Sequence, residues 1–130
     1  MTVVDASALI EVLLGTQAAA AASARLFRPG ERLAAPHLID VEVVQVLRRY
    51  VASGDITEAR GREALEDLRD LPLARYPHDV LIHRIWELRE NATAYDAAYL
   101  ALAEALEAPL VTRDAGIARV PGARARVEVV

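Results

Sequence analysis

The sequence predicts an α/β fold in which helices cover both faces of a mainly parallel β-sheet. Short apolar or β-branched segments alternate along the chain with longer segments of helical periodicity. Strands separated by helices in this way pair in parallel through right-handed crossovers, which place helices on both sides of the sheet. A length of 130 residues and a hydrophobic fraction of 54% are enough for the core of one domain, which we expect to span residues 1–130.

Five short segments are predicted to be strands. The first is rich in β-branched residues, Pro109 introduces the fourth, and Pro121 with Gly122 precedes the last. The predicted strands cover residues 2–5, 32–35, 73–76, 110–112 and 126–129.

Six segments with helical patterns separate or follow these strands. Gly15 ends the first helix, Pro36 opens the third, Gly54 ends the third, and Thr57 starts the fourth. The predicted helices cover residues 6–14, 18–27, 36–52, 57–71, 79–89 and 95–107.

Composition excludes several kinds of chemistry. The chain has no cysteine, and therefore no disulfide, thiolate zinc site or cysteine nucleophile. Its formal charge of −4 does not indicate a nucleic-acid-binding protein, so any nucleic acid must be bound by local arginines. Asp5 and Glu11 interrupt the apolar N-terminal segment, which makes neither a signal peptide nor a membrane span. We expect a soluble cytoplasmic protein with no membrane partner.

Four acidic residues lie where a functional site is expected. In open parallel sheets, sites form beyond the carboxyl ends of the strands, where loops enter helices. Asp5 and Asp114 lie at or just beyond strand ends, Asp96 lies at a helix start, and Glu42 lies in the first half of a helix. Grouped carboxylates repel one another, so four of them facing one point imply a bound metal ion.

Each acid also has a structural explanation that involves no metal. Asp5 and Asp114 could cap the helical turns that follow them, and Asp96 occupies the reciprocal position of a capping box begun by Thr93. Glu42 is harder to explain, because apolar residues surround it on nearly every side of its helix, where a lone glutamate needs a partner or an ion. One metal pocket would account for all four residues.

The segments around these acids form four motifs in an order that covers essentially the whole chain. They are Val-Val-Asp-Ala-Ser-Ala at 3–8, Leu-Ile-Asp-Val-Glu-Val at 38–43, Thr-Ala-Tyr-Asp-Ala-Ala-Tyr-Leu-Ala-Leu-Ala at 93–103 and Leu-Val-Thr-Arg-Asp at 110–114. Together they resemble PIN-domain ribonucleases and, more narrowly, the VapC toxins of bacterial VapBC toxin–antitoxin pairs. The resemblance implies a single PIN domain, a three-layer α/β/α sandwich around a mainly parallel sheet of about five strands, and Mg²⁺- or Mn²⁺-dependent endonucleolytic cleavage of RNA.

The resemblance also assigns roles to individual residues. The acidic catalytic quartet corresponds to Asp5, Glu42, Asp96 and Asp114. We expect Asp5 and Asp96 to hold the principal ion, with Glu42 and Asp114 as further candidate ligands. Ser7 and Thr112 match positions where a hydroxyl orients these acids or a metal-bound water.

Two further charged residues, Asp40 and Arg113, lie close in sequence to these acids. Asp40 points about 200° around the helix from Glu42, so the two acids cannot easily face one ion, and the family pattern favours Glu42. Arg113 is the one arginine that we predict to contact a substrate phosphate, because it lies beside Asp114, whereas most surface arginines are only solvated.

The predicted partners are an RNA substrate, a second copy of the chain and a small antitoxin. Apolar surface on the helices from 36 to 71 could pair with a second copy, and VapC-like proteins form homodimers. By resemblance, a VapB-like antitoxin would block the acidic pocket and would carry the complex to promoter DNA, so DNA contact would be indirect.

Two alternatives come from other classes of protein. A haloacid-dehalogenase-like phosphatase would need a second acid two residues after Asp5, where this chain has Ser7. A catalytically silent PIN scaffold would bind RNA or a protein partner without cleavage, and the complete acidic quartet counts against it.

Overall fold

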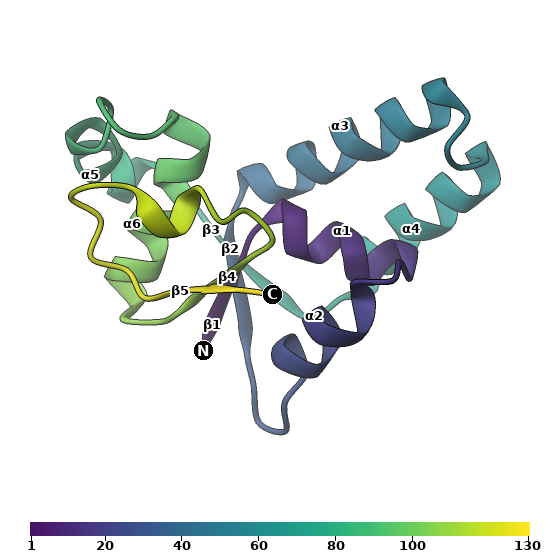
Figure 1. The fold of residues 1–130 in the computed structure, drawn as a ribbon, viewed down its shortest axis with the longest axis horizontal. Helices are drawn as coiled ribbons and strands as arrows, with labels where there is room; N and C mark the ends of the chain where they lie inside the picture. Colours follow the sequence, from purple (N-terminus) through teal and green to yellow (C-terminus); the bar gives the residue numbers. More distant parts are fainter.

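A five-stranded, entirely parallel sheet runs through the middle of the molecule (Figure 1). The computed structural model describes all residues from 1 to 130 and confirms the predicted α/β architecture. The strands are β1 (Thr2–Val4), β2 (Leu33–Pro36), β3 (Leu73–Tyr76), β4 (Leu110–Thr112) and β5 (Val127–Val129).

The strand order, β3-β2-β1-β4-β5, places β1 at the centre of the sheet. Val3 pairs with Ala34 of β2 on one side and with Leu110 of β4 on the other. From β1 the chain moves outward to β2 and β3, and then returns to β4 and β5 on the opposite side of β1. The direction of winding therefore reverses between β1 and β4, and ligands bind at such a switch point beside the carboxyl ends of the strands.

Helices cover both faces of the sheet, as right-handed crossovers require. In Figure 1, α5 and α6 lie on one side, α1 to α4 lie on the other, and α3 with α4 forms a hairpin that extends away from the strands. The helices are α1 (Ala6–Leu14), α2 (Ala19–Leu26), α3 (Leu38–Ser53), α4 (Glu58–Asp70), α5 (Ile82–Glu87) and α6 (Ala94–Leu106), with short 3-10 helices η1 (Asp79–Leu81) and η2 (Ile117–Arg119).

The core is built around β1, β4 and α6. Val3, Val4, Leu110 and Val111 are fully buried, and every residue from Ala97 to Ala103 in α6 is buried. A helix that is apolar on all sides fits only in such an interior position. No single helix has both the length and the apolar composition needed to span a membrane. Only α1 and α2 taken together have that length and composition, and the two helices are bent by 112° relative to each other.

Two predicted helix boundaries were wrong. Pro36 does not open a helix, because the ladder between β2 and β3 continues through a 2.8 Å bond from the His37 amide to the Tyr76 carbonyl, so α3 begins only at Leu38. The segment 79–89 is divided into η1 and α5, and no side chain caps the start of either helix. The N-terminus of α3 is capped from a distance, by His78 Nε2, which accepts a 3.0 Å bond from the Leu38 amide.

An ion cluster ties α2 to the sheet. Arg25 is only 8% exposed, and its guanidinium donates to Glu128 of β5, to Glu31 at 3.1 Å and to Thr2 of β1 at 3.4 Å. The hydrogen bond from Arg25 holds the pKa of Glu128 below its ordinary value, and the same contact raises the pKa of Arg25.

We expect Glu128→Gln to destabilise the protein by about 1–3 kcal/mol at pH 7, because it removes a charged acceptor from the Arg25 cluster. The pKa of Glu128 is lower in the folded than in the unfolded protein, so the stabilisation is present above the unfolded pKa and is lost as pH falls through the folded pKa. Urea unfolding of the wild-type and Glu128→Gln proteins between pH 7 and pH 3 should show that the difference in their free energies of unfolding becomes smaller as pH falls. Glu63→Gln, which changes an exposed pair, is the control, and a difference independent of pH would contradict the prediction.

Candidate active site

Asp5, Glu42, Asp96 and Asp114 line one small cavity of about 110 Å³ at the carboxyl edge of the sheet. Its complete lining is Asp5, Ala6, Ser7, Glu42, Asp96, Tyr99, Asp114 and Ile117. The lining contains four carboxylates and no basic residue. Four larger surface hollows differ in this respect, because each has arginine as well as acidic residues in its lining.

The topology explains why residues so distant in sequence meet there. Asp5 follows β1 directly, and Asp114 comes two residues after β4, the strand paired with β1 across the switch point. Glu42 lies in α3, which follows the carboxyl end of β2. Because α6 leads to the start of β4, its own N-terminus, with Asp96 in the first turn, lies at the carboxyl edge.

Asp5 both caps a helix and lines the cavity. It is the N-cap of α1, and its Oδ1 accepts from the Ala8 amide at 3.0 Å. Ser7 Oγ donates to the same oxygen at 2.7 Å, and Thr112 Oγ1 donates to Oδ2. The side chain is only 5% exposed, so these bonds fix a carboxylate that would otherwise be costly to bury.

Ser7 and Thr112 are themselves held by the chain that follows β4. Ser7 Oγ accepts from the Arg113 amide at 2.9 Å, and Thr112 Oγ1 accepts from the Asp114 amide at 2.9 Å. The two hydroxyl oxygens lie 3.2 Å apart. Both residues predicted to orient the acids therefore bond to Asp5 and join the start of α1 to the end of β4.

Asp96 and Asp114 differ in how their carboxylates are held. Thr93 caps α6 by accepting from the Asp96 amide at 3.1 Å, but the Asp96 carboxylate does not return a bond to Thr93, so only half of the expected capping box forms. Asp114 Oδ1 accepts from the Gly116 amide at 2.8 Å in a local turn, whereas η2 itself, which begins at Ile117, has no side-chain cap. A Cβ at Gly116 would stand 3.0 Å from Asp114 Oδ1, so a glycine suits this tight turn.

The surroundings of Glu42 differ from the prediction. α3 buries only the stripe Ile39, Val43 and Leu47, and Val41 is 72% exposed, so the helix is not enclosed by apolar contacts. Glu42 nevertheless has a partner, because the buried hydroxyl of Tyr99 donates to its Oε1 at 2.6 Å.

Sequence reasoning did not identify Tyr99 as part of the site. The signal that could have found it is its spacing from Asp96, since residues three apart on a helix lie on the same face. Burial, together with the hydrogen bond to Glu42, raises the pKa of Tyr99, which keeps its hydroxyl protonated as a donor.

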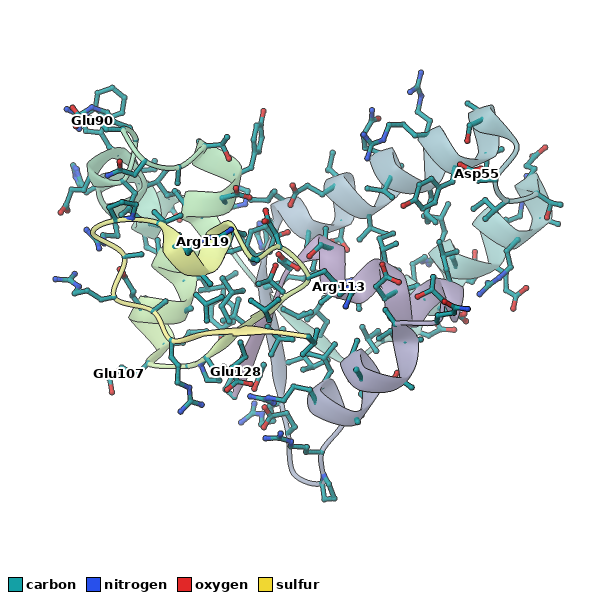
Figure 2. The ribbon with its side chains drawn as sticks, in the orientation of Figure 1. Asp55, Glu90, Glu107, Arg113, Arg119 and Glu128 are labelled. Atoms are coloured by element: carbon teal, nitrogen blue, oxygen red, sulfur yellow. The ribbon has the colours of Figure 1, made fainter.

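Asp40 and Arg113 direct their charged groups to other partners. Asp40 forms a two-pronged ion pair with Arg75, at 2.8 and 2.9 Å, and does not line the cavity, as its position on the helix predicts. The guanidinium of Arg113, labelled in Figure 2, donates to the carbonyl of Val130. Only the backbone amide of Arg113 takes part in the hydrogen bonds around Asp5.

Burial and mutual repulsion disfavour negative charge in the cavity. Burial is the largest effect and raises the pKa of Asp5, although hydrogen bonds from Thr112 and Ser7 act in the opposite direction. Burial likewise raises the pKa of Glu42 and of Asp96, and both are raised further by neighbouring carboxylates. A cation in the cavity would relieve this repulsion.

The donor set fits a hard divalent cation. All of the charged groups are oxygen donors, which Mg²⁺ and Mn²⁺ prefer to nitrogen or sulfur. No three of the acidic or histidine side chains are arranged to hold one ion directly. Mg²⁺ commonly takes only one or two carboxylates directly and keeps several waters, so the cavity does not need three direct carboxylate ligands to hold such an ion.

Comparisons with known proteins identify the family. The PIN domain family model matches residues 2–123. Ribonuclease VapC1 of Mycobacterium tuberculosis is 45% identical over 130 residues, covering 98% of this chain and 96% of the relative. The chain therefore belongs to the PIN-domain family. Ribonuclease VapC9 of the same species is 44% identical over 130 residues, covering 100% of this chain and 98% of the relative, so the resemblance to VapC proteins is confirmed.

Solved structures show the same fold. The structure of PAE2754 from Pyrobaculum aerophilum superposes with a TM-score of 0.72 at 25% identity, covering 99% of this chain and 83% of the other. The structure of VapBC2 from Rickettsia felis bound to a DNA fragment from their promoter has a chain with a TM-score of 0.71 at 14% identity, covering 98% and 97%. The predicted PIN-like three-layer architecture is thereby confirmed.

We expect Asp96→Asn to stabilise the metal-free protein by about 0.5–2 kcal/mol at pH 7, because it removes one of the repelling charges. The pKa of Asp96 is raised on folding, so Asp96 does not destabilise the folded protein at pH values below its unfolded pKa, where it is protonated in both states. Its ionisation destabilises the folded protein increasingly as pH rises through the folded pKa. The advantage of the variant should therefore grow from pH 3 to pH 7 in urea unfolding with EDTA present. Asp67→Asn, an exposed acid on α4, is the control, and an Asp96→Asn protein less stable than wild type at pH 7 would contradict this explanation.

Proposed function

We propose that the protein is a metal-dependent endoribonuclease that acts as the toxin of a toxin–antitoxin pair and cleaves cellular RNA. The observation that carries this proposal is the cavity in which four carboxylates from four segments of the chain meet without a basic residue. The names of its relatives, which are ribonucleases, support RNA as the substrate. The silent-scaffold alternative has no comparable observation in its favour.

In this proposal, Asp5 and Asp96 hold a Mg²⁺ or Mn²⁺ ion directly or through water, and Glu42 and Asp114 complete the pocket. A bound ion supplies the positive charge that offsets the acids, attracts a phosphodiester and activates water. Ser7 and Thr112 orient Asp5, to which both of them donate hydrogen bonds. Arg113 is exposed and adjacent to Asp114, and we propose that it turns from Val130 to contact a substrate phosphate.

The partners follow from the same proposal. A VapB-like antitoxin would cover the acidic cavity, and the solved VapBC2 complex on promoter DNA supports DNA contact through such a partner. The exposed apolar side chains Val41 and Val44 of α3, at 72% and 45% exposure, support association of a second copy through the α3–α4 hairpin.

Cleavage of RNA by the purified chain should require Mg²⁺ or Mn²⁺ and should stop when EDTA is added. Asp5→Asn and Asp96→Asn should each lower the cleavage rate by about 100-fold, because each removes a charge that holds the ion. The matched control is Asp40→Asn, an acid on the same helix as Glu42 whose carboxylate pairs with Arg75 outside the cavity. Full activity of a correctly folded Asp5→Asn protein would contradict the assignment, and RNA binding without cleavage would favour the scaffold alternative.

Purification from the native host should yield the chain together with a small protein that suppresses its metal-dependent cleavage of RNA. Removal of that partner under denaturing conditions, followed by refolding, should restore cleavage. Promoter DNA should bind the complex but not the refolded chain alone, which an electrophoretic mobility assay measures. The toxin assignment fails if no small protein copurifies with the chain and the refolded chain alone does not cleave RNA.

A further inference from the structure

We propose that Tyr99 is a positioning residue that holds the Glu42 carboxylate at the acidic cavity, ready for a divalent cation. The inference rests on the proposed function, because it concerns the same cavity. It adds a residue outside the acidic quartet and its Ser7 and Thr112 supports, and it gives that residue a specific task.

The contact joins two helices that the sheet separates. Tyr99 lies on α6 and Glu42 on α3, and these helices are on opposite sides of the strands (Figure 1). The hydroxyl reaches Glu42 Oε1 at 2.6 Å, a short distance typical of a bond to a charged oxygen. Both residues line the cavity, so the bond is made at its wall.

Glu42 has fewer local hydrogen-bond donors around its carboxylate than Asp5 and Asp114 have. Asp5 is fixed by the Ala8 amide and two hydroxyls, and Asp114 is fixed by the Gly116 amide. The Glu42 carboxylate accepts only the bond from Tyr99. Glutamate has a longer and more flexible side chain than aspartate, and repulsion from Asp5 and Asp96 would drive its charge toward solvent.

Tyr99 is suited to this task because it is itself immobile. The side chain is 2% exposed and belongs to the hydrophobic core, so its ring cannot change rotamer freely. Its hydroxyl has one hydrogen, which goes to Oε1, and the second oxygen of Glu42 remains available to the cavity. A rigid donor thus fixes a flexible acceptor without competing for both of its oxygens.

A purely structural explanation gives a different expectation. Glu42 could serve only to satisfy the buried hydroxyl of Tyr99, in which case the bond would stabilise the fold and have no effect on cation binding. Tyr99→Phe separates the two explanations, because it keeps the ring in the core and removes only the hydroxyl.

We expect Tyr99→Phe to weaken Mn²⁺ binding by about 10-fold in isothermal titration calorimetry with MnCl₂ alone. The Mn²⁺ concentration for half-maximal RNA cleavage should rise by the same factor, and the rate at saturating Mn²⁺ should change less. The matched control is Tyr95→Phe, on the same helix, whose side chain is 64% exposed and makes no hydrogen bond. Unchanged Mn²⁺ affinity in Tyr99→Phe would overturn the proposal.

A double-mutant cycle tests whether Tyr99 acts through Glu42. In a Glu42→Gln background, Tyr99→Phe should have little further effect on Mn²⁺ affinity, whereas an undiminished additional loss would overturn the proposal. Glu42→Asp gives a second test that leaves the core intact, because it keeps the charge but shortens its reach to Tyr99, and it should weaken Mn²⁺ binding by a similar factor. Asp5→Asn serves as the reference. If Asp5→Asn retains full cleavage of RNA, the proposed function fails. If Asp5→Asn is inactive but Tyr99→Phe binds Mn²⁺ as wild type does, only the role of Tyr99 is rejected.

Discussion

Uncompensated negative charge at the switch point between β1 and β4 is the constraint on which the rest of the site depends. Four carboxylates share a cavity of about 110 Å³ that has no basic residue in its lining. Burial raises the pKa of Asp5, Glu42 and Asp96, so the folded chain keeps these acids together at a cost in stability. Such an arrangement is expected where a cation restores the balance of charge.

The backbone that carries two of these acids is deeply buried. β1 is fully buried, and the central part of α6 is buried on all sides, so the backbone that carries Asp5 and Asp96 has little freedom to move the charges apart. Hydrogen bonds among Ser7, Thr112 and the backbone after β4 then fix Asp5. The four carboxylates therefore meet at one edge of the sheet, beside a buried hydrophobic core.

Capping and membership of the site proved to be compatible functions of one side chain. Asp5 caps α1 with one oxygen and lines the cavity, and Asp114 accepts from Gly116 and lines the same cavity. A carboxylate has two oxygens and several lone pairs, so a bond to a backbone amide leaves capacity for a ligand. The cap also fixes the direction of the carboxylate, which a binding site needs.

The sequence by itself determined the fold class, the family and the positions of the five strands, because these depend on local patterns and on motif order. It also predicted the four acids that the structure brings to one cavity. Only the tertiary structure decided which groups became partners. Tyr99 meets Glu42 across 57 positions of the chain, Arg25 meets Glu128 across 103, and His78 caps α3 across 40. The start of α3 was likewise decided by the ladder to β3 and not by the preference of Pro36 for a first helical turn. Such contacts leave no local periodicity in the sequence, since they arise from how separate elements pack.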